Sequence, residues 1–260
     1  MTTEPKSYLV DTLAEMITSC FGLRMDEERI KSLGEAIRYR IDFLGLTSDE
    51  YTKQLTDPAV LAHEVETILC RLTRSDTYFF RRERDFEVIC EKLVPRIISE
   101  QGRKGSLRIW CAGCASGEEA YSVAMSLDAH FPQIASSTVI VATDINLAAM
   151  EVAMRGVYEE ACLKGMSQSY KGYFTRRGDL YEISPTLRKR VRFFGHNLAS
   201  DYDEWEKCGL YNFDIILCRD VLSQFDKAIL LNTLAKLHRS LRPGGFLIPC
   251  LLYTSDAADE

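Results

Sequence analysis

The 260-residue chain lacks any apolar run that approaches the roughly 20 residues of a membrane-spanning helix. Its N-terminus, MTTEPKSYLV, lacks the charged-then-apolar pattern of a secretory signal peptide. We therefore expect a cytoplasmic protein with no direct membrane insertion. The chain also lacks an excess of positive charge, because its formal net charge is −6. This balance disfavours a nucleic-acid-binding protein, and we expect no nucleic-acid partner.

The nine cysteines lack the regular spacing of a disulfide framework or a zinc site. Cys111 and Cys114 form a lone C-x-x-C without a matching second pair. Buried free thiols are the ordinary state of cysteine in an intracellular protein. We therefore predict no metal site and interpret these two cysteines as small residues that line a turn. A zinc or redox role is the alternative.

The first part of the chain has the pattern of helices. Apolar residues recur at helical spacing from Ile30 to Leu44, Gly45 ends that pattern, and Ser48 starts the next one. Residues 59–72 continue it. We predict an all-helical N-terminal domain over residues 1–100, and we interpret residues 95–105 as a linker at its end.

Basic residues surround the apolar stripe of this region, at Arg29, Lys31, Arg38 and Arg40. Exposed charge is the norm on a helix, so a solvated face is the simple interpretation. Docking onto an acidic helical partner is the functional alternative.

A different pattern follows in LTRSDTYFFRRERDF, residues 72–86. Phe79 and Phe80 are expected to fill a core. The arginines at 81, 82 and 84 are either simply exposed or, beside a hydroxyl residue and aromatics, suited to holding a carboxylate.

From Leu107 onward, short β-rich apolar runs alternate with helical patterns, which indicates an α/β domain with a mostly parallel sheet and helices on both faces. The predicted strands are 107–111, 139–142, 191–194, 213–218 and 246–248. Residues 157–190 interrupt the alternation, and we expect a small antiparallel insertion there. The α/β domain spans residues 101–249. Residues 250–260 continue no earlier pattern, and we interpret them as an artefactual, adapter-derived tail, with a genuine disordered tail as the alternative.

The stretch 107–125, LRIWCAGCASGEEAYSVAM, predicts a strand, a glycine turn and a helix, as in nucleotide-binding folds. Gly113 and Gly117 allow a tight turn and close approach of a ligand. The turn differs from the G-x-G-x-x-G fingerprint, and Glu118 and Glu119 at the helix start would repel a pyrophosphate. A cationic or hydroxyl-rich ligand such as S-adenosylmethionine suits it better.

Further candidates follow the later strands. Asp144 comes at the end of the second strand, where an acid can accept both ribose hydroxyls; an N-cap of the next helix is its alternative role. Arg219 and Asp220 follow the strand 213–218, at the edge where ligands bind. A predicted helix is then followed by Arg242-Pro243-Gly244-Gly245 and an apolar strand, an order that is common in adenosylmethionine methyltransferases. Taken alone, this segment indicates only a helix stop and a turn.

Together these segments resemble the CheR-type chemotaxis receptor methyltransferase family over residues 10–248. The resemblance is carried by TRSDTYFFRRERDF, RIWCAGCASGEEAYSVAM, VATDINLAAMEVAMRGVY, FFGHNL and FDIILCRDVLSQFDKAILLNTLAKLHRSLRPGGFLI, in the family's order. It implies a Rossmann-like class I methyltransferase domain and S-adenosylmethionine-dependent O-methylation of receptor glutamates, with S-adenosylhomocysteine as the product. The implied partners are the cytoplasmic helices of methyl-accepting chemotaxis receptors, and we expect the protein to act as a monomer.

The resemblance also implies site residues. Arg81 would orient the carboxylates and is the implied catalytic residue. The implied cofactor-binding residues are Ser75, Thr77, Arg81, Glu118, Asp144, Asn197, Leu198, Arg219 and Asp220.

Three positions depart from the family pattern. Ser75 and Asp220 stand where the family has asparagine, and Gln224 stands where it has a tyrosine near the reacting centre. Ser75 and Asp220 keep hydrogen-bonding ability, whereas Gln224 loses the phenol. The Gln224 departure leaves open a methyltransferase of the same fold with another acceptor. A non-catalytic regulatory module that binds S-adenosylmethionine is a second alternative.

Overall fold

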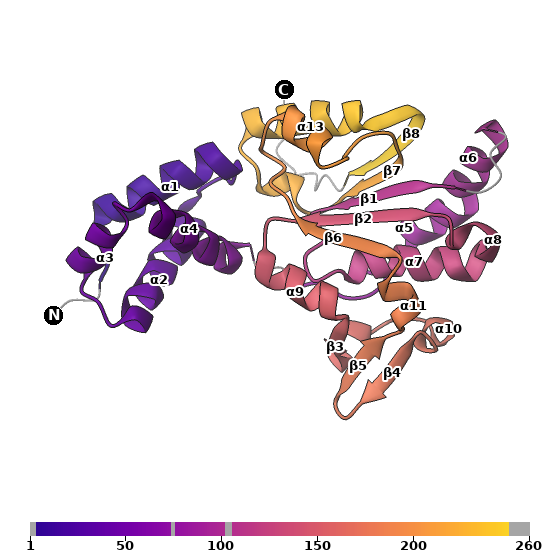
Figure 1. The fold of residues 1–260 in the computed structure, drawn as a ribbon, viewed down its shortest axis with the longest axis horizontal. Helices are drawn as coiled ribbons and strands as arrows, with labels where there is room; N and C mark the ends of the chain where they lie inside the picture. Colours follow the sequence, from indigo (N-terminus) through magenta and orange to yellow (C-terminus); the bar gives the residue numbers. More distant parts are fainter. Residues whose placement is uncertain (1–3, 74–75, 102–105, 250–260) are drawn as a thin grey trace, which may run out of the picture.

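The computed structural model describes residues 4–73, 76–101 and 106–249 (Figure 1). Its first part is helical, as expected, and forms one end of the molecule in Figure 1. Gly45 ends α2 in the left-handed conformation with φ 67°, and a capping box at Thr47 and Glu50 starts α3. The helices are α1 (Ser7–Phe21), α2 (Glu27–Leu44), α3 (Ser48–Gln54) and α4 (Pro58–Leu72).

A buried ion pair joins α2 to α4. Arg40 Nε and Nη2 donate to the two carboxylate oxygens of Glu64 at 2.8 and 2.7 Å, and Tyr51 Oη donates to the same carboxylate at 2.9 Å. All three residues are buried. The interpretation of the basic residues as a solvated face is therefore wrong for Arg40, because its charge is matched inside the helical part. Lys31 and Arg38 do lie exposed.

The predicted linker is wrong for residues 95–101, which are helical. The segment consists of α5 (Glu83–Val88), the π-helical turn η1 (Ile89–Leu93) and α6 (Val94–Gln101). The π-turn precedes Pro95, which has no N–H to donate, and the helix continues beyond it. Residues 102–105 lie outside the described residues.

Four residues of this segment lie in the same hydrophobic cluster as the sheet: Phe86, Ile89, Val94 and Ile97. The expected division put residues up to 100 in the helical domain. On this packing we propose that the α/β part of the chain begins before Glu83.

The predicted parallel sheet is confirmed. In the described part of the chain, five parallel strands pair in the order β6-β2-β1-β7-β8. Their ends differ from the expected ones by a few residues, chiefly in the last strand, where Leu241 already pairs with Phe213 before an irregularity. The strands are β1 (Arg108–Ala112), β2 (Val139–Asp144), β6 (Val191–Gly195), β7 (Phe213–Cys218) and β8 (Leu241–Pro249).

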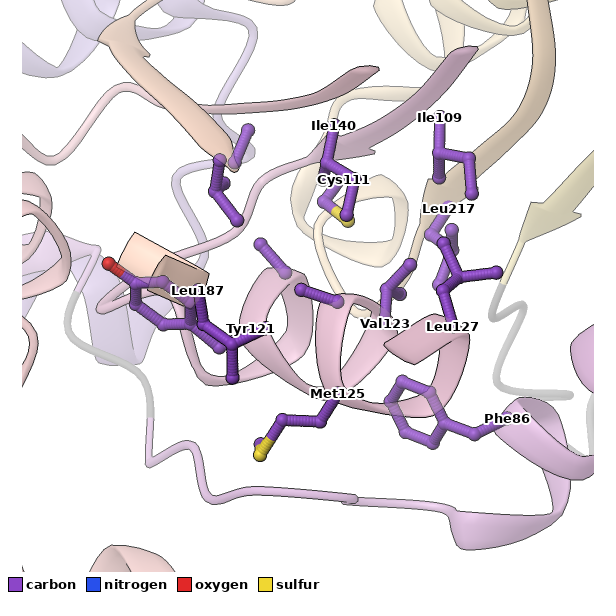
Figure 2. Close-up of a cluster of buried hydrophobic side chains, with 14 of the residues drawn as sticks. Phe86, Ile109, Cys111, Tyr121, Val123, Met125, Leu127, Ile140, Leu187 and Leu217 are labelled. Atoms are coloured by element: carbon purple, nitrogen blue, oxygen red, sulfur yellow. The ribbon is translucent and has the colours of Figure 1, made fainter. Parts of the chain in front are cut away.

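Alternate residues of each strand point to opposite faces of the sheet. Ile109 and Cys111 lie on the face covered by α7, and Figure 2 shows them above that helix with Ile140 and Leu217. Trp110 lies on the other face and packs edge-on against Trp205 of α12. The helices of this part are α7 (Glu118–His130), α8 (Pro132–Ala135), α9 (Leu147–Arg155), α12 (Tyr202–Lys207) and α13 (Lys227–Ser240), with the 3-10 turn η3 (Leu222–Gln224).

The antiparallel insertion is also confirmed. Three strands pair in the order β3-β5-β4 and extend from the main sheet in Figure 1. Phe79, which is buried as expected, packs edge-on against Tyr158 and Phe174 of this insertion. Its elements are β3 (Val157–Glu159), η2 (Glu160–Leu163), α10 (Gln168–Lys171), β4 (Phe174–Arg177), β5 (Leu180–Ile183) and α11 (Pro185–Arg188).

None of the helices in the described ranges combines the length and the apolar character needed to cross a membrane.

Candidate active site

An open cleft lies at the carboxyl ends of β1, β2, β6 and β7. This edge of a parallel sheet is where ligands bind in α/β folds. The loop after each of the four strands contributes to the lining. Phe21, the last residue of α1, and Leu23 just after it add to the lining from the helical region.

The glycine turn after β1 forms the floor of the cleft. Gly113 has φ 81°, and a Cβ there would lie 3.0 Å from the Cβ of Val221. The N–H groups of Gly113 and Cys114 donate to the Thr143 carbonyl at 2.8 and 3.0 Å, which ties the turn to β2. Glycine is thus required for both the backbone conformation and the close approach of the loop after β7.

Cys111 and Cys114 are buried free thiols, as predicted. The Cys114 Sγ lies 3.6 Å from the Sδ of Met150 on α9. Burial raises the pKa of both thiols well above the ordinary value. The pair therefore packs the turn in the thiol form and supplies no thiolate to the cleft.

Asp144 lies where the strand-end rule placed it, at the end of β2 and facing the cleft. Its two carboxylate oxygens accept from the N–H groups of Ala115 and Asn146, each at 2.8 Å. The alternative role as an N-cap is wrong, because Asn146 caps α9 by accepting from the N–H of Ala149. A carboxylate oxygen has more than one acceptor site, so each oxygen of Asp144 keeps capacity for a ligand hydroxyl.

The structure places Glu119, not the expected Glu118, in the cleft. Neighbouring residues of a helix differ by about 100° in direction, so only one member of the pair faces the ligand. Glu118 is buried, accepts from Ser116 Oγ at 2.7 Å, and borders a separate cavity beside Tyr158. The sequence contained no signal that distinguished the two acids.

Arg219 connects three parts of the site from a nearly buried position. Its Nε donates to the Glu119 carboxylate, and its Nη1 donates to Asp85 Oδ2 at 2.7 Å and to the Arg81 carbonyl at 3.1 Å. Burial disfavours the charge, but Glu119 and Asp85 outweigh it and raise the pKa of Arg219. Arg219 therefore stays charged and holds Glu119 and α5 in place.

Two arginines hold a carboxylate at the edge of the cleft. Arg81 Nη1 and Arg82 Nη2 lie 3.3 and 2.9 Å from the two oxygens of Asp220. Arg82 and Asp220 both have φ 61°, a conformation that non-glycine residues seldom adopt. Ala115, which also lines the cleft, has φ 46°, and Phe80, next to Arg81, has φ 58°. Such strained backbone is typical of functional sites.

The loop after β6 adds a residue that sequence reasoning missed, His196. Its ring packs against Trp110 and Trp205, and among the described residues its Nε2 has no hydrogen-bond partner. Burial lowers the pKa of His196 to about 4, so the imidazole is neutral at pH 7. Its position directly before the predicted pair Asn197 and Leu198 was the available signal.

Most of the predicted site residues meet in this one cleft. Asn197 lines it and also donates from Nδ2 to the Cys20 carbonyl at 2.8 Å, which ties the loop to the helical region. Ser75 lies outside the described residues. The predicted residues that line the cleft are Thr77, Arg81, Asp144, Asn197, Leu198, Arg219 and Asp220.

The donor set fits S-adenosylmethionine better than a phosphate-bearing cofactor. Asp144 and Glu119 present acids at the floor, where a ribose diol or a cationic group is favoured and a pyrophosphate is not. The neutral His196 and the apolar Leu198 and Val221 offer a surface for an aromatic base. The arginines lie at a different edge of the cleft, where they hold an anion.

The chain is similar in sequence to known proteins. Residues 75–249 match the family profile described as CheR methyltransferase, SAM binding domain. The chain is 30% identical over 240 residues to Chemotaxis protein methyltransferase 1 of Pseudomonas aeruginosa, which covers 89% of this chain and 79% of that protein. It is 31% identical to Chemotaxis protein methyltransferase Cher2 of Pseudomonas putida, over 94% of this chain and 81% of that protein. It is 33% identical to Chemotaxis protein methyltransferase of Listeria monocytogenes, over 78% and 72% respectively.

Proposed function

The chain belongs to the CheR methyltransferase family, and from this premise we propose that it methylates glutamate side chains on the cytoplasmic helices of chemotaxis receptors. Family membership makes it an S-adenosylmethionine-dependent methyltransferase of chemotaxis. The choice of glutamate as acceptor is the proposed part. The observation that supports it is the pair Arg81 and Arg82, which binds a carboxylate, that of Asp220, at the edge of the cofactor cleft.

The residues that would hold the cofactor lie on the sheet side of the cleft. Asp144 would accept the ribose hydroxyls with the oxygen sites that its two backbone N–H partners leave open. Glu119, held by Arg219, would face the cationic part of the ligand, and the loop at Asn197 and Leu198 would cover the base. When bound, S-adenosylmethionine supplies a methyl group activated by a sulfonium.

The acceptor side needs little acid–base chemistry. A glutamate carboxylate is already ionised at neutral pH, so the protein need not supply a general base. Arg81 would orient the carboxylate by a charge-assisted hydrogen bond. Positioning of two reactants can contribute about 7–11 kcal/mol to barrier lowering, which makes orientation the principal task of this site.

The experiment incubates the protein with methyl-tritiated S-adenosylmethionine and a receptor cytoplasmic fragment. A second fragment, in which the methylation-site glutamates are replaced by glutamine, serves as the control acceptor. We expect label on the first fragment alone, and we expect mild base to release it as methanol because it is a methyl ester. Base-stable label would indicate another acceptor, and cofactor binding without any labelling would indicate a regulatory module.

Arg81→Ala tests the acceptor role, with Arg84→Ala as the matched control. Arg84 is exposed on the same segment and does not line the cleft. A hydrogen bond to a charged group contributes about 1.5–3 kcal/mol, so we expect Arg81→Ala to lower kcat/KM by about 10- to 150-fold. Equal rates for the two variants would remove Arg81 from the acceptor site.

A further inference from the structure

A chain of hydrogen bonds runs from helix α2 to the arginines at the cleft. Arg29 Nη1 and Nη2 donate to the main-chain carbonyl and to the side-chain Oε1 of Gln224, at 3.0 and 2.9 Å. The Gln224 Nε2 donates to the Asp220 carbonyl at 3.1 Å. The Asp220 carboxylate in turn holds Arg81 and Arg82. Two of the departures from the family pattern, Asp220 and Gln224, are thus links of one network.

The backbone fixes the same junction. Leu23 forms an antiparallel bridge with Phe225, the Arg24 N–H donates to the Gln224 carbonyl at 2.9 Å, and the Asp226 N–H donates to the Gly22 carbonyl at 2.9 Å. The Arg29 guanidinium therefore reaches a partner whose position is already set. The helical region need not move for Arg29 to contact Gln224.

The amide of Gln224 suits this role because it accepts and donates at once. Its Oε1 accepts from Arg29 of the helical region, and its Nε2 donates to the Asp220 carbonyl in the loop after β7. A phenol, which has a single oxygen, would not reproduce both contacts at separate atoms. The loop also carries the unfavourable φ of 61° at Asp220, and such a conformation persists only when its surroundings hold it.

We propose that Arg29 is a positioning residue for methyl transfer, which acts through Gln224 to hold Asp220 and thereby the cleft arginine Arg81. The inference rests on the proposed function, since it assigns Arg81 to the acceptor. With this role for Arg29, the helical region contributes to the catalytic rate. Gln224 is then a connecting group in this chain, and acceptor orientation belongs to Arg81.

The kinetic test compares Arg29→Ala with Arg24→Ala. Arg24 is a neighbouring exposed arginine whose side chain pairs with Asp26 and not with Gln224. A misplacement near 1 Å can cost about 100-fold, so we expect Arg29→Ala to lower kcat by about 10- to 100-fold. The KM for the receptor fragment and the affinity for S-adenosylhomocysteine should change less than threefold. Arg29→Lys, which keeps the charge but not the fork of two donors, should recover only part of kcat.

A double variant tests whether the effect passes through Gln224. Gln224→Ala removes the side-chain contact with Arg29 and keeps the main-chain one, so the double variant should lose less of kcat than the product of the two single losses. Multiplicative losses in the double variant, an unchanged kcat in Arg29→Ala, or full recovery by lysine would overturn the proposal.

A readout without turnover separates this inference from the proposed function. Hydrogen exchange of the backbone amides in 219–225 should accelerate in Arg29→Ala and not in Arg24→Ala. Wild-type protein that binds S-adenosylhomocysteine but labels no receptor would refute the proposed function. The hydrogen-exchange result would then still test the linkage from Arg29 through Gln224 to Asp220. Unchanged exchange would refute the linkage whatever the activity.

Discussion

Replacement of Asp144 by alanine is expected to weaken S-adenosylhomocysteine binding strongly. The carboxylate oxygens of Asp144 each hold one backbone N–H at 2.8 Å and face the cleft. Two hydrogen bonds from a ribose diol to this charged group would contribute about 1.5–3 kcal/mol each. The variant should therefore lose about 3–6 kcal/mol of binding free energy, which corresponds to a Kd raised by about 150- to 20,000-fold.

The assay is isothermal titration of S-adenosylhomocysteine into the wild type and the variant, with Asp128→Ala as the control. Asp128 is also a partly buried carboxylate with two donors, Arg190 and Tyr173, but it lies on α7 away from the cleft. We expect Asp128→Ala to lower stability and to leave the Kd unchanged. A Kd within threefold of the wild type for a folded Asp144→Ala variant would refute the ribose assignment.

The pH dependence of binding gives the same prediction a second test. Burial raises the pKa of Asp144 above its ordinary 3.8, against the opposing effect of its backbone hydrogen bonds. The ionised form is the better double acceptor, so affinity is present above the raised pKa and is lost as the pH falls through it. The decline should begin at a higher pH than for an ordinary aspartate and should be absent in the alanine variant.

Three further predictions concern stability, each measured by urea unfolding. Arg219→Met leaves the largely buried Glu119 without its partner and should cost about 3–5 kcal/mol, part of which Glu119→Gln in the same chain should restore. Burial raises the pKa of Glu64, but hydrogen bonds from Arg40 and Tyr51 outweigh it and hold the pKa below the ordinary 4.5. The contribution of the Glu64 carboxylate to folding stability is therefore present above pH 4.5 and lost as the pH falls through the lowered pKa. Glu64→Gln should flatten that loss of stability in acid. Gly117→Ala places a Cβ 2.8 Å from Ala153 at φ 90° and should cost more than Gly165→Ala, where φ is 79° and no atom lies within 4 Å; equal losses would show that backbone strain alone decides.

Much of the fold followed from local patterns. The strands were predictable because short β-rich runs between helical patterns must be buried in a parallel sheet, and β7 has the predicted bounds, Phe213–Cys218. The helix end at Gly45 and the tight turn at Gly113 were predictable because glycine favours such positions, and both residues have a positive φ. Asp144 was found because the end of a parallel strand is a general ligand position.

The errors have a common physical cause, which is that partners distant in the chain leave no local trace. Arg40 lies on the buried stripe of α2 with Ile37 and Ile41, but nothing in that stripe shows that Glu64 on another helix matches its charge. Residues 95–105 were interpreted as a linker, yet the helix continues to Gln101 beyond a π-turn and packs on the sheet. Glu118 and Glu119 are adjacent identical residues, and the direction of α7 relative to the sheet decides which one faces the cleft.

The sequence by itself determined the class of fold, the family and the edge of the sheet that carries the cleft, because periodicity, glycine turns and strand-end acids are local properties. Only the tertiary structure decided which charges meet. It paired Arg219 with Glu119, Asp220 with Arg81 and Arg82, and it brought Arg29 to Gln224, 195 positions away in the chain. Such contacts depend on how helices and loops are oriented after packing, and that orientation is set by the whole core.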